Sequence, residues 1–347
     1  MLDYVPALEE AGFEVTIQSF FDTEYLTALY SGRRAVRSIA WSYVNRIRVL
    51  LHLEEFDAIW LEKEALPWVP AQVESSLLRK NRCLVTDFDD AVFHRYDRHP
   101  SKTVRRILGS KIPKLMLGSD VVFAGNAYLL EYARCSQAPR VEIVPTVVDL
   151  TKYRVPTLRS DGRDKPTIGW IGTPGTWVEC VTQFVPMFEN VLAAENARFV
   201  LVGAGNRPEL SLRFERRNWS EDREVLDIHD MDIGVMPLPD TPWMRGKCGY
   251  KLIQYMACGL PIVASPVGVN REIVEHGVNG FLAESEAEWD AALCKLISDP
   301  DLRHRMGREG RKKVETEYSL QIQAPRVARL LRSAVQAALR RQTLSKS

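Results

Sequence analysis

Residues 230–282, DMDIGVMPLPDTPWMRGKCGYKLIQYMACGLPIVASPVGVNREIVEHGVNGFL, decide which fold the sequence predicts. The apolar run at 233–236 is typical of a strand buried in a parallel sheet. The proline-rich run 237–242 ends that strand, and a helix follows that ends at Gly259. A second buried strand at 262–265 then leads into another helix. This alternation of strands and helices predicts an α/β fold with a parallel sheet.

Glycines and lysines gather at the start of the first of these helices. Gly246 and Gly249 flank the start, and Lys247 and Lys251 are placed to share one helix face. Backbone amides at a glycine-rich helix start form an anion site, and the lysines add positive charge. The segment therefore predicts a site for a phosphate or a diphosphate.

The same segment resembles the donor-binding half of family 4 glycosyltransferases, a retaining, group 1 type family with the GT-B fold. The resemblance rests on Gly268 and on the runs MACGLP at 256–261, IVAS at 262–265, EIV at 272–274 and GVNGFL at 277–282. It is strong over residues 165–285 and extends weakly from residue 4 to residue 331. It implies two Rossmann-like, doubly wound domains that face each other across a cleft.

The sequence departs from the family pattern in two places. Many members carry two glutamates, the second just before the Met-Ala-Cys-Gly run, and here Gly246 and Gln254 stand at those positions. The chain therefore looks like a sub-branch with the motif Lys-Cys-Gly-Tyr-Lys at 247–251. Residues 1–12 resemble the family's first helix, so the strand and glycine-rich loop before it are expected to be missing. Loss of a central strand would expose two strand edges.

Four segments are expected along the chain. Residues 1–153 form an N-terminal, acceptor-side Rossmann-like domain, 154–166 a polar linker, and 167–317 a C-terminal domain that binds a nucleotide-sugar donor. Residues 318–347 form a basic helix which, by the resemblance, returns toward the N-terminal domain. Strands are expected at 13–17, 57–61, 82–88, 121–124 and 141–144 in the first domain, and at 167–172, 198–203, 232–236 and 261–265 in the second.

Two loops at expected strand ends complete the predicted donor site. Small residues at 172–176 would let backbone approach a diphosphate, although a plain strand–helix turn explains them as well. Residues 202–208 imitate a dinucleotide fingerprint without its third glycine, and the resemblance instead makes Gly203 a neighbour of the nucleotide. Gln254 would bind ribose hydroxyls. The predicted donor-binding residues are Gly172, Thr173, Gly175, Thr176, Gly203, Lys247, Cys248, Gly249, Tyr250, Lys251, Gln254 and Glu272.

Two carboxylates follow an expected strand of the first domain. Asp89 and Asp90 are predicted, with Lys247, to be catalytic, through contact with the acceptor or the donor sugar. Spaced carboxylates could instead hold a divalent cation or cap a helix, and His94 and His99 follow in a loop. The resemblance implies a metal-independent reaction without a cofactor, in which the enzyme stabilises the departing diphosphate electrostatically.

Composition excludes several classes of function. The 347 residues carry a net charge of +1, which argues against a nucleic-acid binder. The sequence has no apolar run long enough to cross a membrane, and its six cysteines lack metal-binding spacing. These features favour a cytoplasmic protein.

Basic residues alternate with apolar ones in two stretches of the first half. Such helices can lie on an anionic membrane surface, or they can simply present a solvated charged face. A peripheral membrane position would suit a lipid-linked acceptor. The basic residues are Arg33, Arg34, Arg37, Arg46 and Arg48 in the first stretch, and Arg95, Arg98, Lys102, Arg105, Arg106, Lys111 and Lys114 in the second.

The resulting hypothesis is a glycosyltransferase of the hexosyltransferase type (EC 2.4). It would move a sugar with retention from a nucleotide-diphosphate sugar to a glycan or lipid-linked acceptor, in cell-surface polysaccharide or glycolipid synthesis. Two alternatives stay open: a non-catalytic nucleotide-sugar-binding protein and a nucleotide-sugar epimerase of the GT-B fold.

Overall fold

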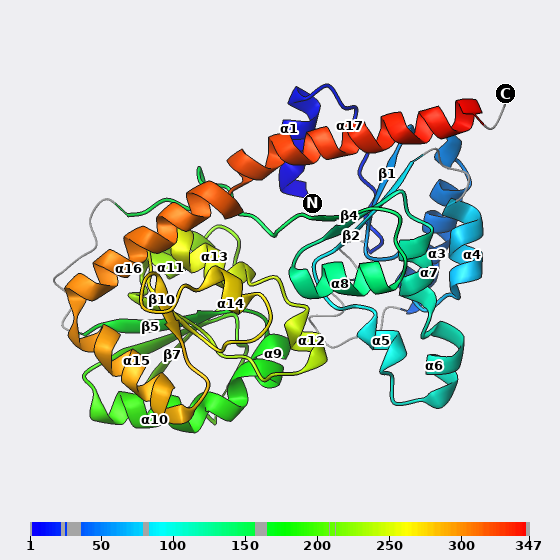
Figure 1. Cartoon of the computed structure of the whole chain (residues 1–347). Coiled ribbons are helices and arrows are strands. Elements are labelled where there is room, and N and C mark those ends of the chain that lie inside the picture. Colours follow the sequence, from blue (N-terminus) through cyan, green and yellow to red (C-terminus); the bar gives the residue numbers. More distant parts are fainter. Residues whose placement is uncertain are drawn as a thin grey trace. The chain divides into compact units, whose positions relative to one another are not determined.

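The computed structural model describes residues 2–21, 25, 36–78, 83–156, 165–207, 209–211 and 213–344. The chain divides into two compact units. Unit 1 comprises Met1–Pro145 with Ala324–Ser347, and unit 2 comprises Thr146–Gln323. Each unit contains a parallel sheet with helices packed on it (Figure 1). The predicted α/β class is therefore confirmed, with a Rossmann-like arrangement of layers in each unit.

Unit 1 is built on a four-stranded sheet in the order β1-β2-β3-β4, and each neighbouring pair is parallel. The central strands are apolar on both faces because helices cover both sides of a parallel sheet. All four strands were predicted from the sequence. They are β1 (Ile59–Glu62), β2 (Leu84–Phe88), β3 (Val121–Ala124) and β4 (Val141–Ile143).

The helices of unit 1 connect these strands or flank them. Asn126 caps the N-terminus of α8, since its side-chain oxygen accepts from the backbone N–H of Leu129 at 2.9 Å. Their bounds are η1 (Leu2–Tyr4), α1 (Val5–Glu10), α3 (Val36–Leu50), η2 (Leu53–Glu55), α4 (Ala71–Leu78), α5 (His94–Asp97), α6 (Lys102–Leu108), α7 (Lys111–Leu117) and α8 (Ala127–Cys135).

The strand expected at 13–17 is wrong, because these residues belong to no strand. The backbone N–H of Phe13 donates to Leu8 O at 3.0 Å and so closes the end of α1. The side chain of Ile17 is largely exposed. The apolar–polar alternation here is too short to distinguish a strand from an extended segment.

Unit 2 contains a six-stranded parallel sheet in the order β10-β9-β8-β5-β6-β7. Four of these strands were predicted. The two edge strands were missed, since one is polar (FERR) and the other begins at a glycine directly after the turn at 277–279. The bounds are β5 (Thr167–Ile171), β6 (Arg198–Val202), β7 (Phe214–Arg217), β8 (Ile233–Met236), β9 (Ile262–Ala264) and β10 (Gly280–Leu282).

The helices of unit 2 pack around a large apolar core. Trp170, Trp177 and Trp289 are among its fully buried side chains. The bounds are α9 (Pro174–Thr176), η3 (Trp177–Val181), η4 (Thr182–Phe184), α10 (Val185–Ala194), α11 (Glu224–His229), α12 (Pro242–Arg245), α13 (Tyr250–Ala257), α14 (Asn270–Ile273), α15 (Glu286–Ser298), α16 (Pro300–Lys313) and η5 (Val314–Tyr318).

The segment 230–282 folds into the predicted order of strand, loop, helix, strand and helix. Gly259 follows α13 at φ +71°, and Leu260 N donates to Tyr255 O at 3.0 Å, which is a glycine C-cap as predicted. The proline-rich run also contains the short helix α12, which the sequence analysis did not foresee.

The long helix α17 (Leu320–Leu344, red in Figure 1) forms the C-terminal region of the described chain. From Ala324 onward it belongs to unit 1, where Arg326 donates to Ile143 O at 2.7 Å. The first boundary between the units falls after Pro145, earlier than the boundary predicted after residue 153. Of the predicted linker 154–166, residues 157–164 lie outside the described chain, as do Arg33, Arg34 and Pro208.

Candidate functional site

The turn after β5 is shaped by a glycine with no room for a side chain. A Cβ atom on Gly172 would lie 2.6 Å from the Trp170 ring and 2.9 Å from Cε of Lys251. Thr173 caps the short helix α9, because its hydroxyl accepts from Thr176 N at 3.2 Å. Gly175 has open space around it. The side chain of Lys251 therefore reaches the predicted 172–176 turn.

The turn after β6 meets the turn after β5. Gly203 adopts φ +77°, and a Cβ atom there would lie 2.2 Å from the carbonyl oxygen of Gly172. Both positions need glycine, one for its left-handed backbone and one for the close approach. Carboxyl ends of neighbouring parallel strands are where ligands bind in open α/β sheets.

Lys247 lies before α13 and Lys251 within it, so the prediction that the two lysines share one helix face is wrong. The Nζ atom of Lys251 lies 5.4 Å from the centre of the Trp170 ring. Burial raises the pKa of the Cys180 thiol, and the charges of Lys251 and Lys247 both oppose that rise. The two lysines therefore lie close enough to Cys180 for their charges to be felt there, and Lys251 also lies beside Gly172.

No side chain caps the start of α13. Gly249, its N-cap residue, adopts φ +68° and provides no side-chain cap. A Cβ atom on Gly249 would lie 2.3 Å from Cδ1 of Ile273. Cys248 is buried, and Tyr250 is partly exposed.

Gln254 is buried inside a polar network that the sequence did not reveal. Its side chain is 3% exposed, and Nε2 donates to the Tyr153 hydroxyl at 2.8 Å. That hydroxyl donates to Glu224 and lies 3.3 Å from the Tyr250 hydroxyl. Trp219 Nε1 donates to the other oxygen of Glu224 at 2.9 Å. The Tyr153 hydroxyl thus links Gln254 to the carboxylate of Glu224. The family resemblance expects a glutamate at position 254 itself.

Local patterns could not have found Tyr153, Trp219 and Glu224, because two separate segments, around 153 and at 219–224, bring them to α13. The predicted Glu272 is exposed on α14. Its charge, after burial and Glu317, raises the pKa of Tyr318 to about 12. The role of Glu272 at the donor site stays a prediction.

The predicted carboxylates of unit 1 follow β2. Asp89 pairs with Lys63 at 2.8 Å, and Asp90 is half-buried next to it. Burial raises the pKa of Asp87 to about 7, and the charge of Asp89 adds to the rise. Trp60 Nε1 donates to Asp87 at 3.2 Å. The pKa of Asp87 is therefore close to neutral pH.

His94 and His99, which follow the predicted carboxylates in the sequence, have different surroundings. His94 is buried between the Asp97 carboxylate and the Tyr128 hydroxyl, each 2.8 Å from a ring nitrogen. His99 is placed edge-on to Trp68, with ring centres 5.8 Å apart.

Neither a metal cluster nor a membrane span is found in the part of the chain that the structure describes. No group of three or more His, Cys, Asp or Glu side chains there could hold a metal ion. None of the helices described there is long and apolar enough to traverse a bilayer.

Residues 165–299 match the family described as Glycosyl transferases group 1. A GDP-mannose-dependent monoacylated alpha-(1-6)-phosphatidylinositol monomannoside mannosyltransferase of Corynebacterium glutamicum is 26% identical over 56% of this chain and 57% of its own length. N-acetyl-alpha-D-glucosaminyl L-malate synthase of Bacillus anthracis is 27% identical over 41% of this chain and 39% of its own length. The chain thus spans about half the length of the curated relatives it matches.

Solved structures share the fold at low sequence identity. A glycosyltransferase from Rickettsia africae has a TM-score of 0.67 at 13% identity and covers 97% of this chain and 93% of its own. Anabaena HepE in complex with UDP has a TM-score of 0.64 at 19% identity and covers 83% and 82%. The fold is therefore GT-B, with two Rossmann-like units. The match to the group 1 glycosyl transferases lies within unit 2.

Proposed function

We propose that this protein is a glycosyltransferase that moves a sugar from a nucleotide-diphosphate sugar to an acceptor hydroxyl with retention of configuration. One observation carries the proposal. Gly172, Gly203 and Lys251 meet at the carboxyl ends of parallel strands inside the domain that matches the group 1 glycosyl transferases.

The chemistry asked of this site is stabilisation of a leaving diphosphate. As the bond from the sugar to the diphosphate breaks, charge grows on the phosphate oxygen that leaves. Lys247, Lys251 and the start of α13 offer positive charge and backbone amides for it, without a metal ion or cofactor. The acceptor oxygen forms the new bond, and its proton passes to the departing diphosphate. Asp89 and Asp90 are proposed to contact the acceptor or the donor sugar.

The ribose of the donor is assigned to Gln254. Its amide lies against Tyr153, which donates to the Glu224 carboxylate. Carboxylates and amides are suitable acceptors and donors for a pair of vicinal hydroxyls. Glu272 is proposed to approach the donor through the start of α14.

The acceptor is proposed to be a glycan or a lipid-linked sugar, in cell-surface polysaccharide or glycolipid synthesis at the cytoplasmic side of a membrane. Support comes from α3, where Trp41, Val44 and Ile47 are exposed three residues apart. Arg48 lies over the Trp41 ring at 5.3 Å. A basic helix with exposed apolar residues suits an anionic membrane surface. Lys111 of the second basic stretch is fully buried and cannot contribute, which corrects that part of the prediction.

Binding of donor nucleotides tests the proposal directly. UDP, GDP and ADP, free and as their glucose and mannose conjugates, should be compared by thermal shift. At a hundredfold excess over Kd, a donor should stabilise the protein by about 2.7 kcal/mol. Release of free sugar without any acceptor would separate an enzyme from a mere binding protein. Absence of a shift with every nucleotide would contradict the proposed donor site.

A further inference from the structure

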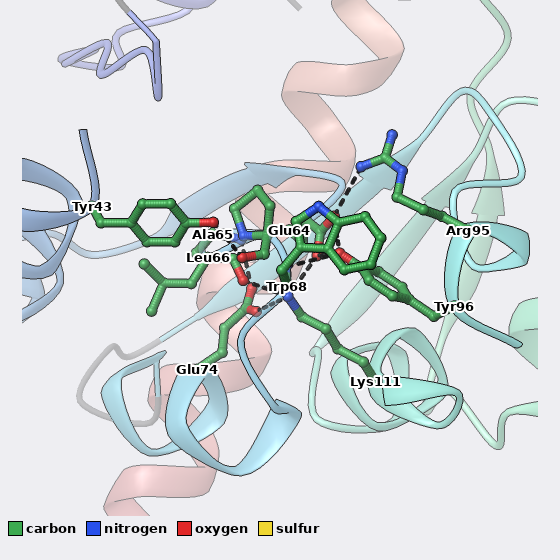
Figure 2. Close-up of polar contacts among 10 residues, drawn as sticks. Tyr43, Glu64, Ala65, Leu66, Trp68, Glu74, Arg95, Tyr96 and Lys111 are labelled. Carbon is green, nitrogen blue, oxygen red and sulfur yellow. Dashed lines mark hydrogen bonds and ion pairs between the residues drawn. The ribbon is translucent and has the colours of Figure 1, made fainter. Parts of the chain in front are cut away.

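Residues 64–68, which follow β1, are fixed at every position (Figure 2). The N–H of Ala65 donates to Glu74 at 2.5 Å, and the N–H of Trp68 donates to the Tyr96 hydroxyl at 3.0 Å. The carbonyl of Leu66 accepts from Lys111, and that of Pro67 accepts from the Tyr43 hydroxyl. Glu64 accepts from both Tyr96 and Lys111.

A buried cluster of three charges lies at the centre of these contacts. The Lys111 ammonium is fully buried, 2.5 Å from Glu64 and 3.0 Å from Glu74, and both carboxylates are buried as well. Desolvation offsets much of the attraction in such a cluster, so it is a weak source of stability. Its clearest effect is to specify one conformation of the 64–68 segment.

The conformation that the cluster holds is a strained one. Lys63 adopts φ +63° and Trp68 adopts φ +61°, and neither is glycine. A bulky residue in this region carries a backbone cost that persists only where the surroundings enforce it. Backbone strain of this kind is concentrated at binding sites. The conformation of Trp68 therefore points to a role in binding.

The result of the strain is a presented indole ring. Trp68 is 48% exposed, so it adds little to the core. Its ring stands edge-on to Tyr96 and His99, at centroid distances of 5.2 and 5.8 Å. Arg95 lies 3.5 Å from Glu64 in the same group (Figure 2). An aromatic face with a few polar groups around it is the usual make-up of a small-molecule site.

We propose that Trp68 is a binding platform for a pyranose ring of the acceptor. The indole would cover the C–H face of the sugar, and Arg95 and His99 would hydrogen-bond its hydroxyls. The inference rests on the proposed function, which requires a hydroxyl-bearing acceptor, but it uses no residue of the donor site. The position fits, because ligands bind at the carboxyl ends of parallel strands, and the Lys63–Asp89 pair ties this segment to the end of β2.

Saturation-transfer NMR on the whole chain tests this platform. The probes are the methyl α-glycosides of glucose, mannose and N-acetylglucosamine. Ring-proton signals should appear with at least one probe, fall about tenfold in Trp68→Gly, and persist in Trp68→Phe. They should be unchanged in Leu117→Ala, a control of equal 48% exposure on α7. Trp68→Gly should keep the fold, because glycine tolerates the positive φ.

Two outcomes would overturn the platform. They are no ring-proton signal from any of the probes, and signals that survive Trp68→Gly. If Trp68→Gly fails to fold, Trp68→Asn must reproduce its expected binding loss, since asparagine also tolerates this φ. Thermal shifts with UDP and GDP should stay unchanged in all variants. Absence of these shifts in the parent would contradict the donor site and leave the platform standing.

Discussion

The turn after β5 in unit 2 and the segment after β1 in unit 1 occupy equivalent places, each at the carboxyl end of a parallel strand. They are held by different means. In unit 2, Gly203 at φ +77° lets its backbone press against Gly172. In unit 1, Lys63 and Trp68 adopt a similar φ without being glycine, and a buried charge cluster holds them. The conformation of the glycine turn is determined by its own residues. The conformation of the 64–68 segment depends on residues far away in sequence.

The largest effect is expected from removing the cation of the unit 1 cluster. Lys111→Met leaves Glu64 and Glu74 buried without their partner, which should destabilise unit 1 by about 3–5 kcal/mol. Burial, opposed mainly by Lys111, already raises the pKa of Glu74, and the variant should raise it further. The native state then binds a proton that the unfolded state releases, so the variant should regain stability at acid pH.

Urea unfolding of Lys111→Met at pH 5 and pH 8, followed by hydrogen exchange in unit 1, measures this effect. Lys114→Met is the matched control, because Lys114 lies on the same helix and is exposed. Equal stability of the two variants would mean that the charges do not hold the 64–68 segment.

The glycine turn of unit 2 should be destabilised by a side chain at Gly203, because that side chain would contact the backbone of the neighbouring turn. A methyl group on Gly203 would collide with the Gly172 carbonyl and strain a left-handed φ, so Gly203→Ala should cost about 3 kcal/mol. Gly175→Ala is the control, because its added Cβ atom meets nothing within 4 Å. Melting temperatures should separate the two variants, and a tolerated Gly203→Ala would show that the turns do not depend on this contact.

Most of the fold could be predicted from local pattern. The strands β2, β3, β5, β6, β8 and β9 are rich in apolar residues, and Gly259 marks the end of α13. The missed strands β7 and β10 are polar or short, so their pairing depends on the neighbouring strand more than on their own residues. The false strand at 13–17 shows the converse, since apolar residues without a pairing partner form no sheet.

The candidate site could be predicted only where the backbone makes it. Gly172, Gly203 and Gly249 were identified, because glycine at a strand end or helix start is visible in the sequence. Glu224 and Tyr153, which lie next to Gln254, were missed, because tertiary packing brings them together from distant segments. The Glu64–Lys111–Glu74 cluster was missed for the same reason.

The lysines of unit 2 should affect binding more than folding. Lys251→Ala and Lys247→Ala should each weaken binding of UDP or GDP by about 1.5–3 kcal/mol, the loss expected for a charge-assisted contact. Calorimetric titration measures this loss. Lys312→Ala on α16, where Lys312 is exposed, should leave the affinity unchanged. Unchanged affinity in both test variants would remove the lysines from the site and leave the glycine turns without a ligand role.

The smallest effect concerns pH and separates the two units most cleanly. Burial, reinforced by Asp89, raises the pKa of Asp87 to about 7. The folded state therefore keeps a proton that the unfolded state loses near pH 4, so the stability of unit 1 should fall as pH rises from about 4 to 7. Because the side chain is only partly buried, about 1 kcal/mol is expected across this range.

Asp87→Asn keeps an acceptor for Trp60 and should flatten the dependence of unit 1 stability on pH. Hydrogen-exchange protection of 85–88, corrected for intrinsic rates, should follow this curve, while that of 199–202 in unit 2 should not. A parallel loss in both units, or an unchanged curve in Asp87→Asn, would show that the charges of unit 1 do not make it the pH-sensitive half.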